Sequence, residues 1–326
     1  MQLKPWNFLL FALTLQLVSA SAGDRLPEFK ECVSACMSTV CDNNPPRLPF
    51  YLTALFWDCP QDCDYECQRK ITTERNLEDK EILQFHGKWP FKRFLGIQEP
   101  ASVVFSILNF IPHYHAIFEL RKKIPENDAR SNYYLKNFYL VVPVLGMNAW
   151  IWSSVFHCRD FRLTERLDYF SAGLYVMTGF YFGIVRIFRL DRIEHARLLH
   201  VFTVACIVAV ASHISYLSLI KFSYSYNMIA NVSVGVLQNL IWCYYSISQY
   251  FFVQASSRQA WKLWPIANVI LLTFAMSLEL FDFPPLLDAI DAHSLWHAAT
   301  IIPSYWWYEW MKKDAEEVAS IKSRRT

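Results

Sequence analysis

Charged residues are scarce in this sequence of 326 residues, making up 18% of the chain against 54% hydrophobic residues. The net charge is only +2 at pH 7, which argues against a nucleic acid as the partner because no basic excess is available to bind phosphates. The sequence also contains no evident internal repeat. Its aromatic content of 17% exceeds that of an ordinary soluble domain and is typical of a membrane protein with several spans and aromatic belts.

The N-terminus is similar to a cleavable signal peptide over residues 1–22. Lys4 gives a positive start, residues 8–18 form a short apolar run, and Ala20 to Ala22 form a small-residue cleavage site. A first transmembrane helix is the alternative, but the apolar run is too short to span a bilayer comfortably. We therefore expect cleavage after Ala22.

The cysteines lack the tight CxxC spacing of zinc ribbons, which disfavours a zinc knot. Most of them instead fall in one short window after the signal peptide: Cys32, Cys36, Cys41, Cys59, Cys63 and Cys67. An even set in this position predicts three disulfides in an oxidising compartment, with a connectivity that the spacing leaves open. The remaining cysteines lie in or beside the apolar runs and are expected to be free: Cys158, Cys206 and Cys243.

Long apolar runs separated by short charged loops follow the cysteine-rich region. Each has about the ~20 residues that a membrane-crossing helix needs: 101–119, 133–156, 168–188, 198–219, 227–250, 263–281 and 293–311. We therefore predict an all-α membrane protein with seven transmembrane helices and a small disulfide-rich N-terminal lumenal domain. The expected divisions are a signal peptide (1–22), a cysteine-rich lumenal domain (23–98), a seven-span domain (99–311) and a cytosolic tail (312–326).

Basic residues are few in the loops on one side of the predicted membrane, and residues 281–292 contain none. The loops on the other side carry more, notably around Arg121–Lys123 and Arg189–Arg197, and the C-terminal tail adds others. The positive-inside rule places these loops in the cytosol and the cysteine-rich region in the lumen. This orientation agrees with the signal peptide.

Three histidines are predicted to meet at the lumenal face. His293 and His297 are four residues apart at the start of the last run, so they lie on one face of a helix, and His157 ends the second run. Three histidines leave the fourth position of a zinc ion open, which is the ligand arrangement of a catalytic zinc. An isolated HxxxH pair could equally be interfacial histidines without a metal.

Two further polar residues are candidates for chemistry at this site. Ser153 lies one helical turn before His157 and could donate a hydrogen bond to an oxyanion or a water. Asp168 begins the third run and could take a proton from a water that a zinc ion has acidified. Both have structural alternatives, since Ser153 could bond its own backbone and Asp168 could serve the helix dipole.

Other polar residues are candidates for supporting roles. His213 could replace one of the three ligands or support one from close by. Asp288 and Asp291 could help to orient a ligating imidazole, although Asp291 could equally be a helix N-cap. His113 and His115 are two residues apart and point to different faces of a helix, so neither is expected in the site.

Three motifs carry a resemblance to a known superfamily. The segments Ser153–His157, Leu163–Phe170 and Asp291–His297 resemble, in this order, the motifs of the CREST superfamily of membrane hydrolases. Gln84–Phe91 and Gln98–Ser102, together with the six-cysteine region, resemble its Per-one-like branch, also called post-GPI-attachment to proteins factor three.

The resemblance implies a zinc-dependent ester hydrolase that removes the sn-2 acyl chain from the phosphatidylinositol of GPI anchors, a phospholipase A2-like reaction. Its partners would be GPI-anchored proteins and their lipid, in the endoplasmic reticulum or Golgi membrane with the site facing the lumen. A ceramidase-like amidase and a non-enzymatic seven-span receptor or chaperone are the alternatives. The resemblance places Zn²⁺ on His157, His293 and His297, supported by Ser153 and Asp168, with looser matches at Glu99 and Asn109.

Overall fold

The computed structural model describes residues 21–42, 48–127, 134–280 and 282–323. These residues form helices and loops, apart from an isolated antiparallel bridge between Phe85 and Lys88. The chain divides into two compact units: the first is Met1–Gly96 with Pro284–Ala289, and the second is Ile97–Phe283 with Ile290–Thr326. Residues 1–20 of the predicted signal peptide lie outside the described residues.

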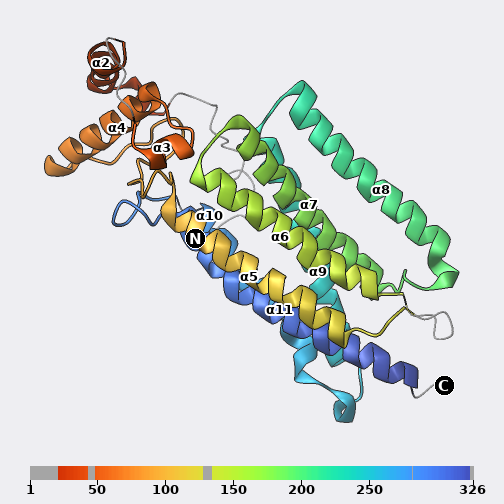
Figure 1. The fold of residues 1–326 in the computed structure, drawn as a ribbon. Helices are drawn as coiled ribbons and strands as arrows, with labels where there is room; N and C mark the ends of the chain where they lie inside the picture. Colours follow the sequence, from red (N-terminus) through yellow and green to blue (C-terminus); the bar gives the residue numbers. More distant parts are fainter. Residues whose placement is uncertain (1–20, 43–47, 128–133, 281, 324–326) are drawn as a thin grey trace, which may run out of the picture. The chain divides into compact units, whose positions relative to one another are not determined.

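The first unit is built on two helical segments, one containing α2 and the other α4 (Figure 1), and disulfides join them. The segments with their neighbours are η1 (Gly23–Arg25), α2 (Pro27–Cys36), η2 (Met37–Cys41), α3 (Phe50–Ala54) and α4 (Cys59–Leu77). The pairs are Cys32–Cys67, Cys36–Cys63 and Cys41–Cys59. The first cysteine of α2–η2 thus pairs with the last cysteine of α4, and the last of α2–η2 pairs with the first of α4. The three predicted disulfides are confirmed, and their nested order shows that the two segments run antiparallel.

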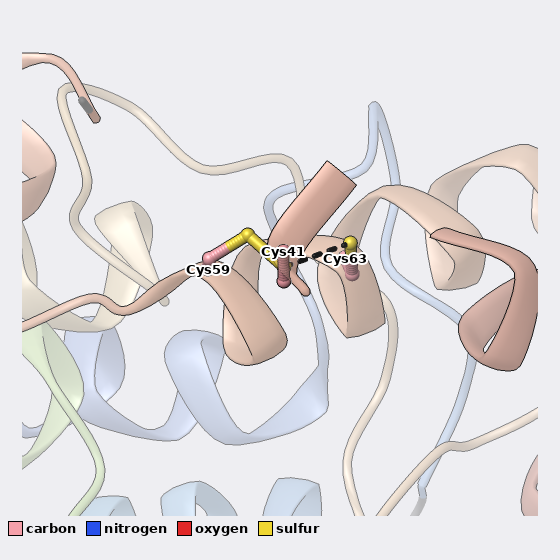
Figure 2. Close-up of side chains that lie close together, drawn as sticks. All are labelled: Cys41, Cys59 and Cys63. Atoms are coloured by element: carbon pink, nitrogen blue, oxygen red, sulfur yellow. Dashed lines mark hydrogen bonds between the residues drawn. A yellow bond between two sulfur atoms is a disulfide. The ribbon is translucent and has the colours of Figure 1, made fainter. Parts of the chain in front are cut away.

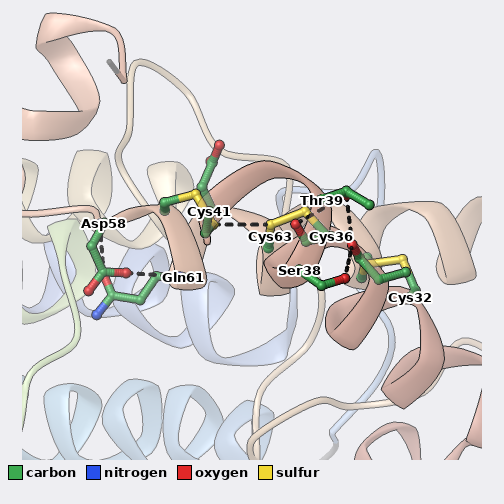
Figure 3. Close-up of a disulfide and its surroundings, with 12 residues drawn as sticks. Cys32, Cys36, Ser38, Thr39, Cys41, Asp58, Gln61 and Cys63 are labelled. Carbon is green, nitrogen blue, oxygen red and sulfur yellow. Dashed lines mark hydrogen bonds between the residues drawn. A yellow bond between two sulfur atoms is a disulfide. The ribbon is translucent and has the colours of Figure 1, made fainter. Parts of the chain in front are cut away.

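Local sequence explains how α4 begins beside this disulfide ladder (Figure 3). Asp58 caps the helix by accepting a hydrogen bond from the Gln61 backbone N–H at 2.9 Å, and the Gln61 side chain accepts from the Asp58 N–H at 3.2 Å. This reciprocal capping box satisfies two backbone donors that a helix start otherwise leaves unpaired. The start of α4 is thereby fixed at Cys59, directly after the Asp58 cap.

The second unit is a helical bundle (Figure 1). Its long helices are α5 (Pro100–Lys123), α6 (Lys136–Cys158), α7 (Arg162–Ile187), α8 (Ala196–Ser215), α9 (Tyr224–Phe251), α10 (Trp264–Leu280) and α11 (Ala292–Ser323). Short helical turns extend or connect them: η3 (Ile193–His195), η4 (Tyr216–Ile220), η5 (Ala255–Ser257) and η6 (Ala260–Leu263). Contacts run from α5 through α6, α7, α9, α10 and α11 back to α5, and α8 packs on α7.

Five helical segments are long and apolar enough to cross a membrane, which identifies a multi-pass membrane protein. They are Pro100–Lys123, Lys136–Cys158, Arg162–Ile187, Ile193–Ile220 and Ala260–Glu279. The all-α prediction is confirmed, whereas α9 and α11 form helices at the predicted places without reaching the same apolarity. The count of seven spans therefore remains a prediction.

Polar side chains on α9 and α11 account for their lower apolarity. On α9, the amide of Gln238 lies so close to Gly179 of α7 that a Cβ there would come within 2.6 Å of its Oε1. On α11, buried Asp314 accepts two hydrogen bonds from Arg186, at 2.6 and 2.7 Å, and one from Tyr245 at 2.9 Å. Both polar groups face other helices, and the hydrogen-bonding needs of Asp314 are met there.

Candidate metal centre

Two of the three predicted ligands are positioned by the start of α11. Asp291 caps this helix by accepting from the Ser294 backbone N–H at 2.8 Å, while the Asp291 N–H donates to Ser294 Oγ at 3.0 Å. His293 and His297 follow in the first two turns and share one face of the helix. Asp291 is thus an N-cap, the structural alternative considered for it.

The third predicted ligand, His157, lies at the end of α6 and is held by the residues that precede α5. The Gln98 and Glu99 backbone N–H groups donate to the carbonyls of Cys158 and His157, each at 3.0 Å. Glu99 Oε2 also lies 2.8 Å from His157 Nδ1. Backbone and side-chain bonds together fix the position of this imidazole.

The three imidazoles meet through their Nε2 atoms. His293 Nε2 is 3.3 Å from His157 Nε2 and 3.1 Å from His297 Nε2. Two nitrogens bound to one tetrahedral zinc at the usual bond length would lie about 3.3 Å apart. His157 and His297 are buried and His293 is half-buried, and these three residues form a group that can hold a metal ion.

Each Nδ1 atom points away from this centre toward an oxygen. The partners are Glu99 Oε2 for His157 at 2.8 Å, Glu279 Oε2 for His293 at 2.6 Å, and Ser106 Oγ for His297 at 2.9 Å. This pattern is that of metal-ligating histidines, whose second nitrogen is oriented by a carboxylate or another oxygen.

The carboxylate partners determine which nitrogen carries the proton. An ionised carboxylate only accepts hydrogen bonds, so His157 and His293 donate from Nδ1, and in its neutral form each ring presents a lone pair at Nε2. Two lone pairs facing each other at 3.3 Å repel unless a cation or a shared proton lies between them. A buried set of imidazole nitrogens arranged in this way fits Zn²⁺, which binds neutral imidazole in tetrahedral geometry.

Ser153 is connected to the histidines through a second serine. Its Oγ lies 3.0 Å from Ser106 Oγ, which in turn contacts His297 Nδ1, and both serines are buried. Asp168 lies half-buried in the second turn of α7. Among the residues the structure describes, it is outside the group of ligand atoms close enough to share one ion with the three histidines.

Asn109 supports the site from α5. Its Nδ2 donates to the His297 carbonyl at 2.7 Å, and its Oδ1 accepts from Thr300 Oγ1 at 3.1 Å. These bonds join the middle of α5 to the first turns of α11. Asn109 thus fixes the backbone that carries His297, one of the predicted ligands.

The other candidates from the sequence have different partners. His213 Nε2 lies 3.1 Å from Asn227 Oδ1, and Asp288, in the first unit, forms an ion pair with Arg69 at 2.7 Å. Buried His113 contacts the Tyr308 hydroxyl and accepts from Trp150 Nε1 at 3.1 Å. None of these contacts involves a site histidine.

Two site residues were not recognised from the sequence: Glu279 and Ser106. Glu279 interrupts the end of an apolar run, and an ionisable side chain at such a place usually has a partner or a function. Ser106 belongs to a stripe of buried polar residues on α5 spaced three and four apart, which is one helix face: Glu99, Ser102, Ser106, Asn109 and His113. That spacing is visible in the sequence and would have identified Ser106.

Comparison with known proteins identifies the family. The model of the Per1-like family matches residues 49–315. Protein PER1 homolog of Schizosaccharomyces pombe is 44% identical, with 92% of this chain and 89% of the relative covered, and protein PER1 of Saccharomyces cerevisiae is 41% identical, with 91% and 93% covered. GPI-specific phospholipase A2-like PGAP3 of Homo sapiens is 35% identical, with 95% and 94% covered.

No solved structure gives a significant match. The family match spans both the disulfide-linked helix α4 and all three histidines. The chain belongs to the Per1-like family.

Proposed function

We propose that this protein is a zinc-dependent hydrolase that removes the sn-2 acyl chain from the phosphatidylinositol of GPI anchors. The observation that carries the proposal is the convergence of three imidazole Nε2 atoms whose Nδ1 atoms are all engaged elsewhere. The substrate class rests on relatives named GPI-specific phospholipase A2-like PGAP3. These names favour an ester substrate over the amide of a ceramidase-like reaction.

The residues that would hold the ion are His157, His293 and His297. Zinc bound there would act as a Lewis acid toward the ester carbonyl and would lower the pKa of water. Glu99 and Glu279 keep the Nδ1 protons of His157 and His293 in place and hold both rings at a fixed orientation. The donor atoms are thereby preorganised, which reduces the reorganisation needed during the reaction.

Ser153 and Asp168 would act on the reacting groups. The Ser153 hydroxyl belongs to a hydrogen-bonded chain that runs through Ser106 to His297, and it suits stabilisation of the negative charge that develops on the ester oxygen. Asp168 suits the base that accepts a proton from the attacking water. Both assignments are part of the proposal.

The location proposed for the reaction is the lumenal leaflet of the endoplasmic reticulum membrane, with the Golgi membrane as the alternative. His157 ends α6 and His293 begins α11, so the ligands lie within a turn or two of helix ends. A phospholipid ester lies at the corresponding depth in a bilayer. The acyl chains could therefore remain in the membrane while the glycan stays in the lumen.

The full-length protein, reconstituted in lipid, tests the proposal through metal content and GPI-lipid hydrolysis. We expect one zinc per chain, and loss of both zinc and released sn-2 fatty acid in His293→Ala, because two histidines do not make a stable catalytic site. His115→Ala is the matched control, since His115 is exposed on α5. Hydrolysis retained by His293→Ala would refute the ligand assignment, and metal without fatty-acid release would refute the reaction.

A further inference from the structure

Large apolar side chains are exposed on three short segments of the first unit. Phe50, Phe56 and Leu287 are among the most exposed, at 85%, 74% and 90%. We call the whole set the apolar rim; its members are Phe50, Tyr51, Phe56, Phe94, Leu95, Leu286 and Leu287. Leaving such side chains in water is costly, so a concentration of them on one small unit requires an explanation.

The backbone holds several of these side chains in a conformation that apolar residues rarely adopt. Phe56, Leu95 and Leu287 have φ values of 59°, 51° and 54°, in the left-handed region. The residues after Leu95 and Leu287, namely Gly96 and Asp288, are left-handed as well, so each pair forms a tight turn. Glycine, asparagine and aspartate are the usual residues at such positions. Leucine at the first position of both turns costs free energy and gains no burial within the unit.

The three segments of the rim are fastened to one another by specific bonds. Trp57 Nε1 donates to the Gly96 carbonyl at 2.8 Å, which ties the segment after α3 to the turn at Leu95. The Lys92 N–H donates to the Asp288 carbonyl at 2.8 Å. This bond ties the segment that leads into the turn at Leu95 to the turn at Leu287. Arg69 adds a 2.7 Å ion pair with Asp288. The three segments that carry the apolar rim are therefore held in fixed positions relative to one another.

Glycine at position 96 is required for this arrangement. A Cβ there would come within 2.9 Å of the Tyr51 carbonyl oxygen and 3.1 Å of Leu55 Cδ1. The backbone of the turn thus lies directly against the segment that carries Phe50 and Tyr51. Close packing of the backbone forces the adjacent Leu95 side chain outward, where it is 60% exposed.

The covalent chain connects the rim to membrane-crossing helices. Leu95 precedes the first residue of α5 by five positions, and Leu287 lies in the connection between the end of α10 at Leu280 and the start of α11 at Ala292. Both α5 and the segment containing α10 are apolar enough to cross a membrane. The rim therefore lies in sequence where the polypeptide leaves the bilayer.

We propose that the apolar rim is a lipid-binding surface, inserted in the interfacial layer of the leaflet where α5 and α11 begin. The lipid removes from water the apolar area that the left-handed turns expose, and this gain offsets the conformational cost of those turns. The disulfide-linked unit is then bound to the membrane surface through the apolar rim, in addition to its covalent connections. This inference is independent of zinc and of the proposed reaction.

Site-specific photo-crosslinking tests the proposal in the full-length protein. A benzophenone amino acid replaces Phe56 or Leu287, and the protein is reconstituted in phosphatidylcholine nanodiscs and irradiated. Leu77 provides the matched control because it is 81% exposed, but it ends α4, about 27 Å along the helix from Cys59. Mass spectrometry without reduction confirms the three disulfides in each variant, so that only folded protein is compared.

We expect at least about tenfold more phosphatidylcholine adduct at positions 56 and 287 than at position 77, since burying one large apolar side chain favours the apolar phase by at least that ratio. Two rim positions are used so that loss of one variant to misfolding leaves the other informative. Equal adduct yields at the rim and at position 77 would overturn the proposal. Crosslinks from the rim to a second copy of the chain, in place of lipid, would also overturn it.

Discussion

The two nitrogens of each site imidazole have different partners, and this division determines what the site can bind. Carboxylates at Nδ1 of His157 and His293 leave the Nε2 lone pairs directed at a common point. Replacing a carboxylate by an amide keeps an acceptor of the same shape but removes its charge. The contribution of the charge can therefore be measured separately from that of the hydrogen bond.

Glu279→Gln is expected to weaken zinc binding by about 10- to 100-fold, because the carboxylate that orients His293 also raises the basicity of its ring. Competition with a chelator of known affinity, on the full-length protein, gives the change. Glu316→Gln is the control, since Glu316 is exposed near the other end of α11. Unchanged zinc affinity in Glu279→Gln would contradict the orienting role.

A second prediction at the residue scale concerns His113, a buried histidine outside the predicted metal site. A Cβ on Gly146 of α6 would come within 2.3 Å of His113 Nδ1, and His113 is held by Tyr308 and Trp150. Gly146→Ala should lower the free energy of unfolding by about 1–3 kcal/mol, as overpacked buried sites do. Gly235→Ala has open space around its Cβ and should change stability by less than about 1 kcal/mol. Thermal unfolding in one detergent compares the two, and equal effects would argue against the close contact.

At the scale of elements, the disulfide ladder holds neighbouring bonds within exchange distance (Figure 2). Cys41 Sγ, bonded to Cys59, lies 3.7 Å from Cys63 Sγ, which is bonded to Cys36. A thiolate at Cys41 could attack Cys63, forming a Cys41–Cys63 bond and releasing the Cys36 thiolate. The ladder therefore depends on every cysteine having its partner.

Cys59→Ser is accordingly expected to yield a mixture of Cys36–Cys63 and Cys41–Cys63 pairs, because it frees Cys41 beside an intact disulfide. The double variant Cys41→Ser, Cys59→Ser should keep the other two bonds and lose about 2–4 kcal/mol of stability. Peptide mapping without reduction distinguishes these outcomes. A single, native pairing of Cys36 with Cys63 in Cys59→Ser would show that exchange does not occur.

The positions of the helices could be predicted from the sequence, whereas most contacts between the helices could not. Each of the seven apolar runs lies in a helix of the described chain. For the five segments that are apolar enough to cross a membrane, the reason is that a backbone in lipid must pair its own polar groups. The nested disulfide order was not predictable, since spacing allows many pairings. The role of Glu279 was missed because its partner, His293, follows a connection whose residues 284–289 belong to the first unit. Ser106 was missed although its three- and four-residue spacing from other polar residues marks a polar helix face.

At the scale of the whole molecule, the orientation of the chain decides which side of the membrane the site faces. The distribution of arginine and lysine predicts that the connection between α6 and α7, residues 159–161, lies in the lumen. A glycosylation acceptor inserted there should be modified in cells, and one inserted between α7 and α8, at residues 188–192, should not. The reverse pattern would place the site in the cytosol and contradict action on GPI lipid in the lumenal leaflet.

The side chains of the site come from the first and the last helices of the second unit. The order in which these helices are synthesised has a consequence for biosynthesis. Glu99 directly precedes α5 and His157 lies in α6, whereas His293 and His297 belong to the last helix, α11. While the chain is being made, Glu99 and His157 can satisfy each other, aided by the backbone bonds at residues 98 and 99. The three histidines are together only when α11 has been translated and inserted, so under the proposed function an unfinished chain would be inactive toward the lipid of the membrane that receives it.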